Sequence, residues 1–118
     1  MAEKIAPTSL PRSMSYAHGM RELPSLIALQ SFEASLRFAS FSRAADELGR
    51  TQGAVSRQIA KLEQQLGVQL FVRANARLHA TPAARSFGAK LSPVLDRLAA
   101  LTLELQSTGG AASVLQLA

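Results

Sequence analysis

The segment from Thr51 to Lys61, TQGAVSRQIAK, concentrates side chains that can bond to nucleic-acid bases and phosphates. In the major groove of DNA, glutamine can form two hydrogen bonds with adenine and arginine can do so with guanine, and the segment offers Gln52 and Arg57. The Ser56 hydroxyl and the Lys61 ammonium group are of the kinds that hold phosphate oxygens. This combination predicts contact with double-stranded DNA.

A helix must present these side chains on one side. Apolar residues at Val55, Ile59, Leu62 and Leu66 follow steps of four, three and four, which is the spacing of one helix face. Thr51 can cap the start of this helix, and Gly67 can end it. The polar residues therefore lie on the opposite face, free to contact a ligand.

A second, shorter helix is predicted just before it, within FSRAADEL. Ser42 can accept a hydrogen bond from an unpaired N–H in its first turn, and Gly49 can adopt the left-handed conformation that ends a helix. Another helix, from about Ser25 to Arg37, precedes this pair and supports it with an apolar face. Two capped helices joined by a tight turn form a helix-turn-helix, which is a weak signal by geometry alone.

The order of the residues is a stronger signal. The run A-A-x-x-L-x-x-T-Q-x-A-V-S-x-Q-I-x-x-L-E-x-x-L-G-V-x-L-F-x-R, which begins at Ala44 and ends at Arg73, resembles the DNA-binding domain of the LysR-type transcriptional regulators. The resemblance implies a winged helix-turn-helix beginning near Leu23, a linker helix after it, and a homodimer formed by antiparallel pairing of two linker helices. It covers residues 23 to 118.

A two-stranded wing is predicted after Gly67. The run from Val68 to Val72 is β-like, the residues Arg73 to Arg77 form a turn, and Leu78 to Ala80 return as a second strand. Arginines on a wing can reach the minor groove. LysR-type proteins usually carry a second basic residue where this chain has Ala76, so we expect the adjacent Arg77 to take its place.

Two sets of DNA-contacting residues follow. Gly53 joins the groove-facing set because a residue without a Cβ lets the backbone approach DNA closely. The expected base-reading residues are Gln52, Gly53, Ser56 and Arg57, and the expected phosphate or wing contacts are Ser42, Arg43, Thr51, Lys61, Arg73 and Arg77.

Thr81 and Pro82 predict the start of a long helix that runs to about Gln106, with a bend near Lys90 caused by Pro93. Its apolar seam is too long for one small domain to cover. The seam either folds back on the core or pairs with a second copy, and the resemblance favours pairing. The expected dimer residues are Phe87, Leu91, Val94, Leu95, Leu98, Leu101 and Leu105.

The two ends of the chain carry further expectations. Residues 1–22 lack helical or strand periodicity and are predicted to be a disordered leader. Residues 23–81 then form the winged domain and 82–108 the linker helix. Residues 109–118 are expected to be a hinge and one strand, Ser113 to Leu117. The resemblance implies that this strand would open an effector-binding domain that is otherwise absent, so no small-molecule effector site is expected here.

The composition of the chain excludes several classes of function. The chain has 118 residues, a net charge of +5 and no cysteine. Disulfides and thiolate metal sites are excluded, and a reducing bacterial cytoplasm is the natural setting. Two isolated histidines and no convergent carboxylates argue against an enzyme, so no metal or cofactor is expected. No apolar run is long enough to predict a membrane span.

The sequence therefore predicts a mainly α fold, a winged helix-turn-helix of three helices and a two-stranded wing followed by a long dimerisation helix. The predicted function is sequence-specific binding of double-stranded DNA, as the reader domain of a bacterial regulator that recognises an interrupted palindromic operator as a dimer. An alternative is a helical adaptor protein whose long apolar helix binds a partner and whose basic face is only solvated.

Overall fold

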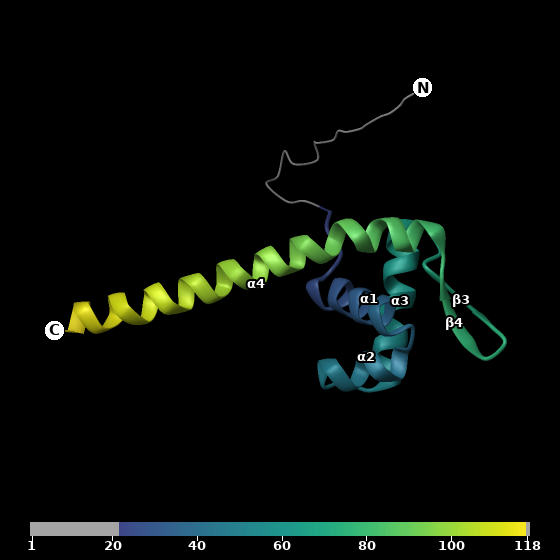
Figure 1. Ribbon diagram of the computed structural model, residues 1–118, viewed down its shortest axis with the longest axis horizontal. Coiled ribbons are helices and arrows are strands. Elements are labelled where there is room, and N and C mark those ends of the chain that lie inside the picture. Colours follow the sequence, from purple (N-terminus) through teal and green to yellow (C-terminus); the bar gives the residue numbers. More distant parts are fainter. Residues whose placement is uncertain (1–21, 118) are drawn as a thin grey trace, which may run out of the picture.

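The computed structural model describes the chain from residue 22 to residue 117, with side chains as far as Gly109, and confirms the predicted architecture (Figure 1). The expected leader, residues 1–22, lies outside this range except for Glu22. Six elements follow in order: α1 Leu26–Phe38, α2 Phe41–Leu48, α3 Gln52–Leu66, β3 Phe71–Ala74, β4 Arg77–Ala80 and α4 Pro82–Leu117. The first three helices form a bundle, the strands form a hairpin beside it, and α4 projects away on the opposite side (Figure 1).

The ends of the short helices are fixed by local hydrogen bonds. Thr51 Oγ1 accepts a bond from the N–H of Ala54 at 3.1 Å, so Thr51 caps α3 as predicted. Gly49 and Gly67 end α2 and α3 with φ angles of 65° and 68°, again as predicted. A Cβ is unfavourable in this left-handed region, which explains glycine at both positions.

The cap of α2 corrects one prediction. Ser40, not Ser42, caps the helix, because its extended backbone precedes Phe41 and its Oγ accepts a bond from the N–H of Arg43 at 3.1 Å. Ser42 already belongs to the first turn of α2 and therefore cannot cap it. The shift places Phe41, the first residue of the helix, in the core.

Four phenylalanines connect α1, α2, β3 and α4 in the core. The Phe32 ring lies 5.3 Å from that of Phe87 and 5.8 Å from that of Phe71, and the Phe71 ring in turn lies 5.7 Å from that of Phe41. These residues belong to α1, α4, β3 and α2, respectively. Each buried ring adds hydrophobic stabilisation, and the tilted and edge-on arrangements suit aromatic pairs. The core therefore fixes the wing and the start of α4 against the helix-turn-helix.

The wing is shorter at its base than predicted. Its strands pair antiparallel from Phe71 opposite Ala80 to Ala74 opposite Arg77, which leaves Asn75 and Ala76 as a two-residue turn. The predicted strand start at Val68 is wrong, because the N–H of Val68 bonds back to the carbonyl of Glu63 at the end of α3. The predicted turn from Arg73 to Arg77 is also too long, since its outer residues belong to the strand ladder.

Helix α4 begins as predicted, with Thr81 Oγ1 accepting a bond from the N–H of Ala84, and continues as one helix to Leu117. The predicted bend at Pro93 is not visible as a sharp kink, because α4 forms one gently curved ribbon (Figure 1). The predicted hinge and strand after Gln106 are likewise wrong. A lone strand would leave its backbone groups unpaired, whereas a helix satisfies them within the same segment, and this outweighs the cost of two glycines.

Candidate nucleic-acid interface

A hollow of about 560 Å³ opens where the starts of α2 and α3 meet the wing. Three separate parts of the chain supply its walls, which shows how the fold gathers residues that are distant in sequence. Its lining consists of Ala39, Ser40, Phe41, Ser42, Gln52, Arg73, Ala76, Arg77, Leu78 and His79. The predicted residues Ser42, Gln52, Arg73 and Arg77 are thus brought to one face of the molecule.

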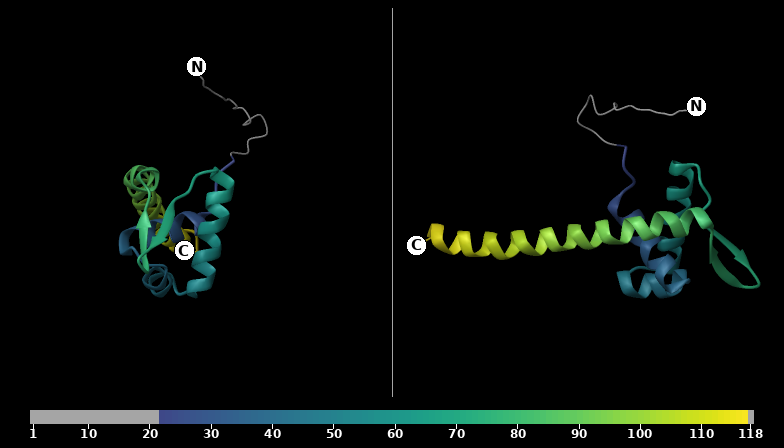
Figure 2. Two further views of the ribbon diagram at one scale, coloured as in Figure 1. Left: turned by 90° about the vertical axis from the view of Figure 1, so that its right-hand side faces the viewer. Right: turned by 45° about the horizontal axis from the view of Figure 1, so that its top comes forward.

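Helix α3 presents its polar side as the apolar periodicity predicted. Val55, Ile59 and Leu62 are buried against the bundle, while Gln52 and Ser56 are exposed. Gln52 lines the large hollow. Ser56 lines a smaller one of about 160 Å³ between α3 and the wing, to which Arg73 also contributes. The two hollows share Phe41, Arg73 and Leu78 and are therefore neighbours along one surface. The left-hand view of Figure 2 shows α3 upright with the wing beside it.

Arg57 and Lys61 are exposed on α3 but line neither hollow. Arg57 folds back along the helix, so that its Nη1 lies 3.4 Å from the place where a Cβ on Gly53 would be. The missing side chain of Gly53 therefore leaves room for the Arg57 guanidinium over the first turn of α3. Thr51, the cap residue, is exposed beside them.

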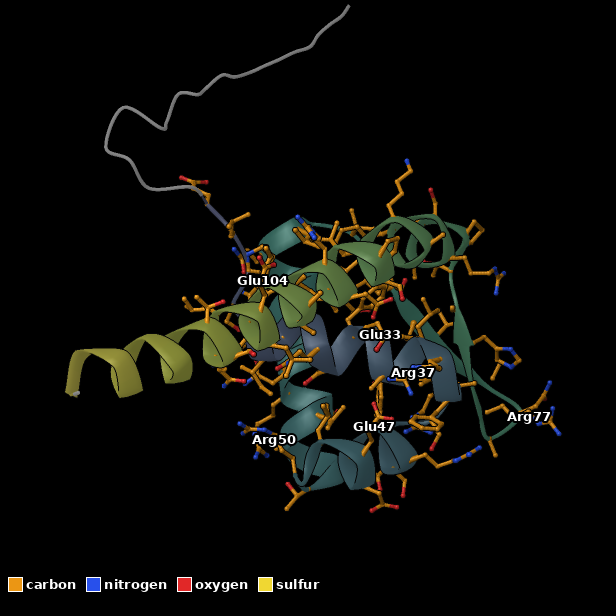
Figure 3. The ribbon with its side chains drawn as sticks, turned by 60° about the vertical axis from the view of Figure 1, so that its left-hand side comes forward. Glu33, Arg37, Glu47, Arg50, Arg77 and Glu104 are labelled. Carbon is orange, nitrogen blue, oxygen red and sulfur yellow. The ribbon has the colours of Figure 1, made fainter. Side chains whose placement is uncertain are left out.

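The wing arginines differ in their surroundings. The Arg73 guanidinium lies over the Phe41 ring, 5.5 Å from its centroid, where a cation and an aromatic face attract each other. Arg77 lies at the free end of the hairpin and points outward (Figure 3). Because Arg73 is paired with buried Leu78 and Arg77 with exposed Ala74, the two arginines occupy opposite faces of the hairpin, although both line the large hollow.

An ion-pair cluster lies between α1 and α2. Arg37 donates to the Glu33 carboxylate at 2.9 and 3.0 Å and to the Glu47 carboxylate at 2.5 and 2.8 Å, which joins α1 to α2 (Figure 3). Its hydrogen bonds to Glu47 and then Glu33 raise the pKa of Arg37 above its ordinary value. The same bond lowers the pKa of Glu47. Arg37 and Glu47 therefore stay charged near neutral pH.

Glu63 has a structural role that the sequence did not reveal. Its Oε2 accepts hydrogen bonds from the N–H groups of Leu70 and Phe71 at 2.8 and 3.2 Å. The last turn of α3 thus holds the start of the wing. In the sequence, Glu63 was visible only as an acidic residue within a basic segment and as one match to the family pattern.

The structure divides the predicted dimer seam. Leu91 is buried in the core of its own chain, and Phe87 and Leu95 pack partly against that core. The prediction that the whole seam faces a second copy is therefore wrong for Leu91. Beyond this point the apolar residues are exposed, with Val94 at 61%, Leu98 at 44%, Leu101 at 44% and Leu105 at 71%.

None of the helices between residues 22 and 117 combines the length and apolar character needed to cross a lipid bilayer. Among proteins of known role, the chain is 45% identical over 78 residues to the glycine cleavage system transcriptional activator homolog of Haemophilus influenzae, covering 66% of this chain and 26% of that protein. It is 48% identical over 85 residues to the transcriptional activator AmpR of Providencia stuartii, covering 72% and 26%. The chain spans about a quarter of the length of these relatives.

Solved structures agree with the fold. A mutant of Corynebacterium glutamicum OxyR superposes with a TM-score of 0.69 at 26% identity, over 75% of this chain and 28% of that one. The protein in the BenM_DBD/benA site 1 DNA complex superposes with a TM-score of 0.57 at 34% identity, over 70% of this chain and 97% of that one. Residues 26–85 match the model for bacterial regulatory helix-turn-helix proteins of the lysR family. The chain therefore belongs to the lysR family of bacterial helix-turn-helix regulators and carries the DNA-binding domain of that family.

Proposed function

We propose that this chain reads an interrupted palindromic operator in double-stranded DNA as a homodimer, with each domain binding one half-site. The observation that carries the proposal is the shared hollow, which brings Ser42 of α2, Gln52 of α3 and the wing residues Arg73 and Arg77 to one surface. A polyanion that lies along this surface can touch all three elements at once. The alternative adaptor function leaves this convergence unexplained.

Each element has a distinct task in this proposal. Helix α3 enters the major groove, where Gln52, Gly53, Ser56 and Arg57 meet base edges. The start of α2 meets the flanking phosphates through Ser42 and Arg43, and α3 meets them through its cap Thr51 and through Lys61 in its second half. The wing places Arg73 and Arg77 along the adjacent minor groove.

The proposed dimer forms through the exposed part of α4. Two copies related by a twofold axis present the same apolar stripe to each other, and the two domains then face two half-sites. In this proposal the chain supplies DNA reading and dimer contacts in the bacterial cytoplasm, and it needs no cofactor for either. The BenM structure supports the proposal, because it is a complex with benA site 1 DNA.

Arg57 and Lys61 provide the test of base reading. We expect Arg57→Ala to weaken binding to the cognate site by about 1–3 kcal/mol while random DNA is affected much less, because the guanidinium contacts a base. Lys61→Ala should weaken both by similar factors, because a phosphate contact carries no sequence information. The cognate site is first selected from a random duplex pool, and both affinities are then measured by fluorescence anisotropy.

Salt dependence separates DNA binding from the adaptor function. Each phosphate contact contributes a slope of about −0.9 in log K against log salt, so several contacts give a steep line. A chain that selects no sequence from the pool and shows a flat salt dependence would rule out the proposed function. An unchanged ratio of cognate to random affinity in Arg57→Ala would instead assign Arg57 to a phosphate.

A further inference from the structure

Phe38 differs from the other phenylalanines of the helical bundle. It is the last residue of α1 and only half-buried, and it belongs to no pair in the aromatic core. Two guanidinium groups share its ring instead, since the Cζ atoms of Arg37 and Arg43 lie 4.9 and 4.7 Å from the ring centroid. In the fold, the Phe38 ring is therefore a platform for cations.

Two cations at one ring repel each other unless one of them is compensated. Arg37 is compensated, because it forms salt bridges with the carboxylates of both Glu33 and Glu47. Among the residues that the structure describes, no carboxylate comes within 4.0 Å of the Arg43 guanidinium. The cluster thus balances the inner arginine and leaves Arg43 as a cation available to an anion outside the protein.

The position of Arg43 is electrostatically unfavourable for the isolated domain. It lies in the first turn of α2, which contains no acidic residue, and a helix start carries a partial positive charge that favours anions. Ser42 is its neighbour in the same turn and lines the DNA-facing hollow. A cation held in this place, beside N–H groups at the start of a helix, suits a bound phosphate.

We propose that Phe38 is a positioning residue for DNA binding, whose ring holds the Arg43 guanidinium in place for a backbone phosphate at the edge of the half-site. The inference rests on the proposed function and adds a residue that itself touches no DNA. Without the ring, the long Arg43 side chain samples many rotamers, and ordering it on DNA costs affinity. The salt bridges of Arg37 with Glu33 and Glu47 support Arg43 indirectly, because they keep the Phe38 ring in place between α1 and α2.

A double-mutant cycle tests this coupling. The four proteins are the parent chain, Phe38→Leu, Arg43→Ala and the double variant, and each is titrated with a short duplex that carries one selected half-site. Arg43→Ala should reduce the salt slope by about 0.9, the value for one phosphate. Phe38→Leu should weaken binding about two- to fivefold, as expected for one exposed cation–π contact, and should have no further effect in the Arg43→Ala background.

Two matched variants separate positioning from a merely structural role. Phe38→Tyr keeps the ring face and should bind as tightly as the parent. Arg43→Lys keeps the charge but loses the flat guanidinium, so it should retain the salt slope and still lose about two- to fivefold in affinity. This variant leaves the core untouched, and it therefore gives a result even if Phe38→Leu fails to fold.

Three outcomes would overturn the inference while leaving the proposed function intact. They are an unchanged salt slope in Arg43→Ala, parental affinity in Arg43→Lys, and equal losses from Phe38→Leu with and without Arg43. If the parent chain itself showed no salt-dependent DNA binding, the proposed function would fail first, and the two failures are thus distinguishable.

Discussion

Two alanines adopt backbone conformations that usually belong to glycine. Ala39, after α1, has a φ of 52°, and Ala76, in the wing turn, has a φ of 59°. The left-handed region brings the Cβ close to the following carbonyl and costs roughly 1–2 kcal/mol for an ordinary residue. Asn75, the first residue of the wing turn, tolerates the same region better because its polar side chain can bond locally.

Replacing Ala76 with glycine should stabilise the domain. Both turn residues have positive φ, which is the two-residue hairpin turn that favours Asn-Gly. We expect Ala76→Gly to raise the free energy of unfolding by about 0.5–1 kcal/mol, because the strain removed exceeds the added entropy of the unfolded chain. Urea denaturation followed by circular dichroism measures it. The matched control is Ala74→Gly, inside the strand ladder, which should destabilise, and a loss of stability in both variants would contradict the turn assignment.

The sequence predicted the roles of single residues correctly where one chemical property decides which residue type fits the position. Thr51, Gly49 and Gly67 were predictable because a cap needs a side-chain oxygen and a left-handed helix end needs no Cβ. Ser40 and Ser42 could not be separated in this way, since both are serines and the burial of Phe41 selects between them. The cation–π contacts of Arg43 and Arg73 were equally out of reach, because they join residues whose proximity depends on the whole fold.

At the scale of elements, the wing is held by few bonds at its base. The Glu63 carboxylate accepts from two backbone N–H groups, and Thr81 Oγ1 donates to the carbonyl of Gln69 at 2.8 Å. These bonds hold the wing against α3, and the proposed simultaneous contact with both grooves depends on the angle between them. The sequence pattern predicted that the wing exists and that its two strands pair. The register of the strands and the base of the wing follow from these tertiary bonds.

Removing the Glu63 carboxylate should affect both stability and DNA binding. Glu63→Ala leaves two part-buried N–H groups without their acceptor, so we expect a loss of about 1–3 kcal/mol in the free energy of unfolding. Glu63→Gln retains one acceptor oxygen and should lose less than half as much. Thermal unfolding gives the stabilities, and titration with operator DNA should show a parallel order of affinities. If Glu63→Ala unfolded like the parent chain, the wing would have to be held by the Thr81 hydrogen bonds and the burial of Phe71 and Leu78 instead.

At the scale of the whole molecule, the two parts of α4 have different surroundings. Its first turns complete the core through Leu91 and Phe87, and its later turns extend beyond the bundle with large apolar side chains in contact with solvent (Figure 1). The periodicity predicted one uninterrupted seam because it cannot show where the supporting domain ends. An exposed apolar stripe on a projecting helix is typical of a surface that pairs with a partner.

Two substitutions on α4, seven residues apart on the same face, should therefore have opposite effects. Leu91→Glu places a charge in the core and should unfold the domain, because an unpaired buried carboxylate costs several kcal/mol. Leu98→Glu places the same charge where the side chain is 44% exposed, so the domain should stay folded while the dimer dissociates. Each domain then binds its half-site alone, and operator affinity should fall by a factor on the order of a hundred although Leu98 touches no DNA.

Circular dichroism reports folding, sedimentation reports the oligomeric state, and anisotropy reports affinity. A parent chain that sediments as a monomer at micromolar concentration, or a Leu98→Glu chain with parental operator affinity, would contradict pairing through α4, since the exposed stripe would then contribute nothing to the bound state.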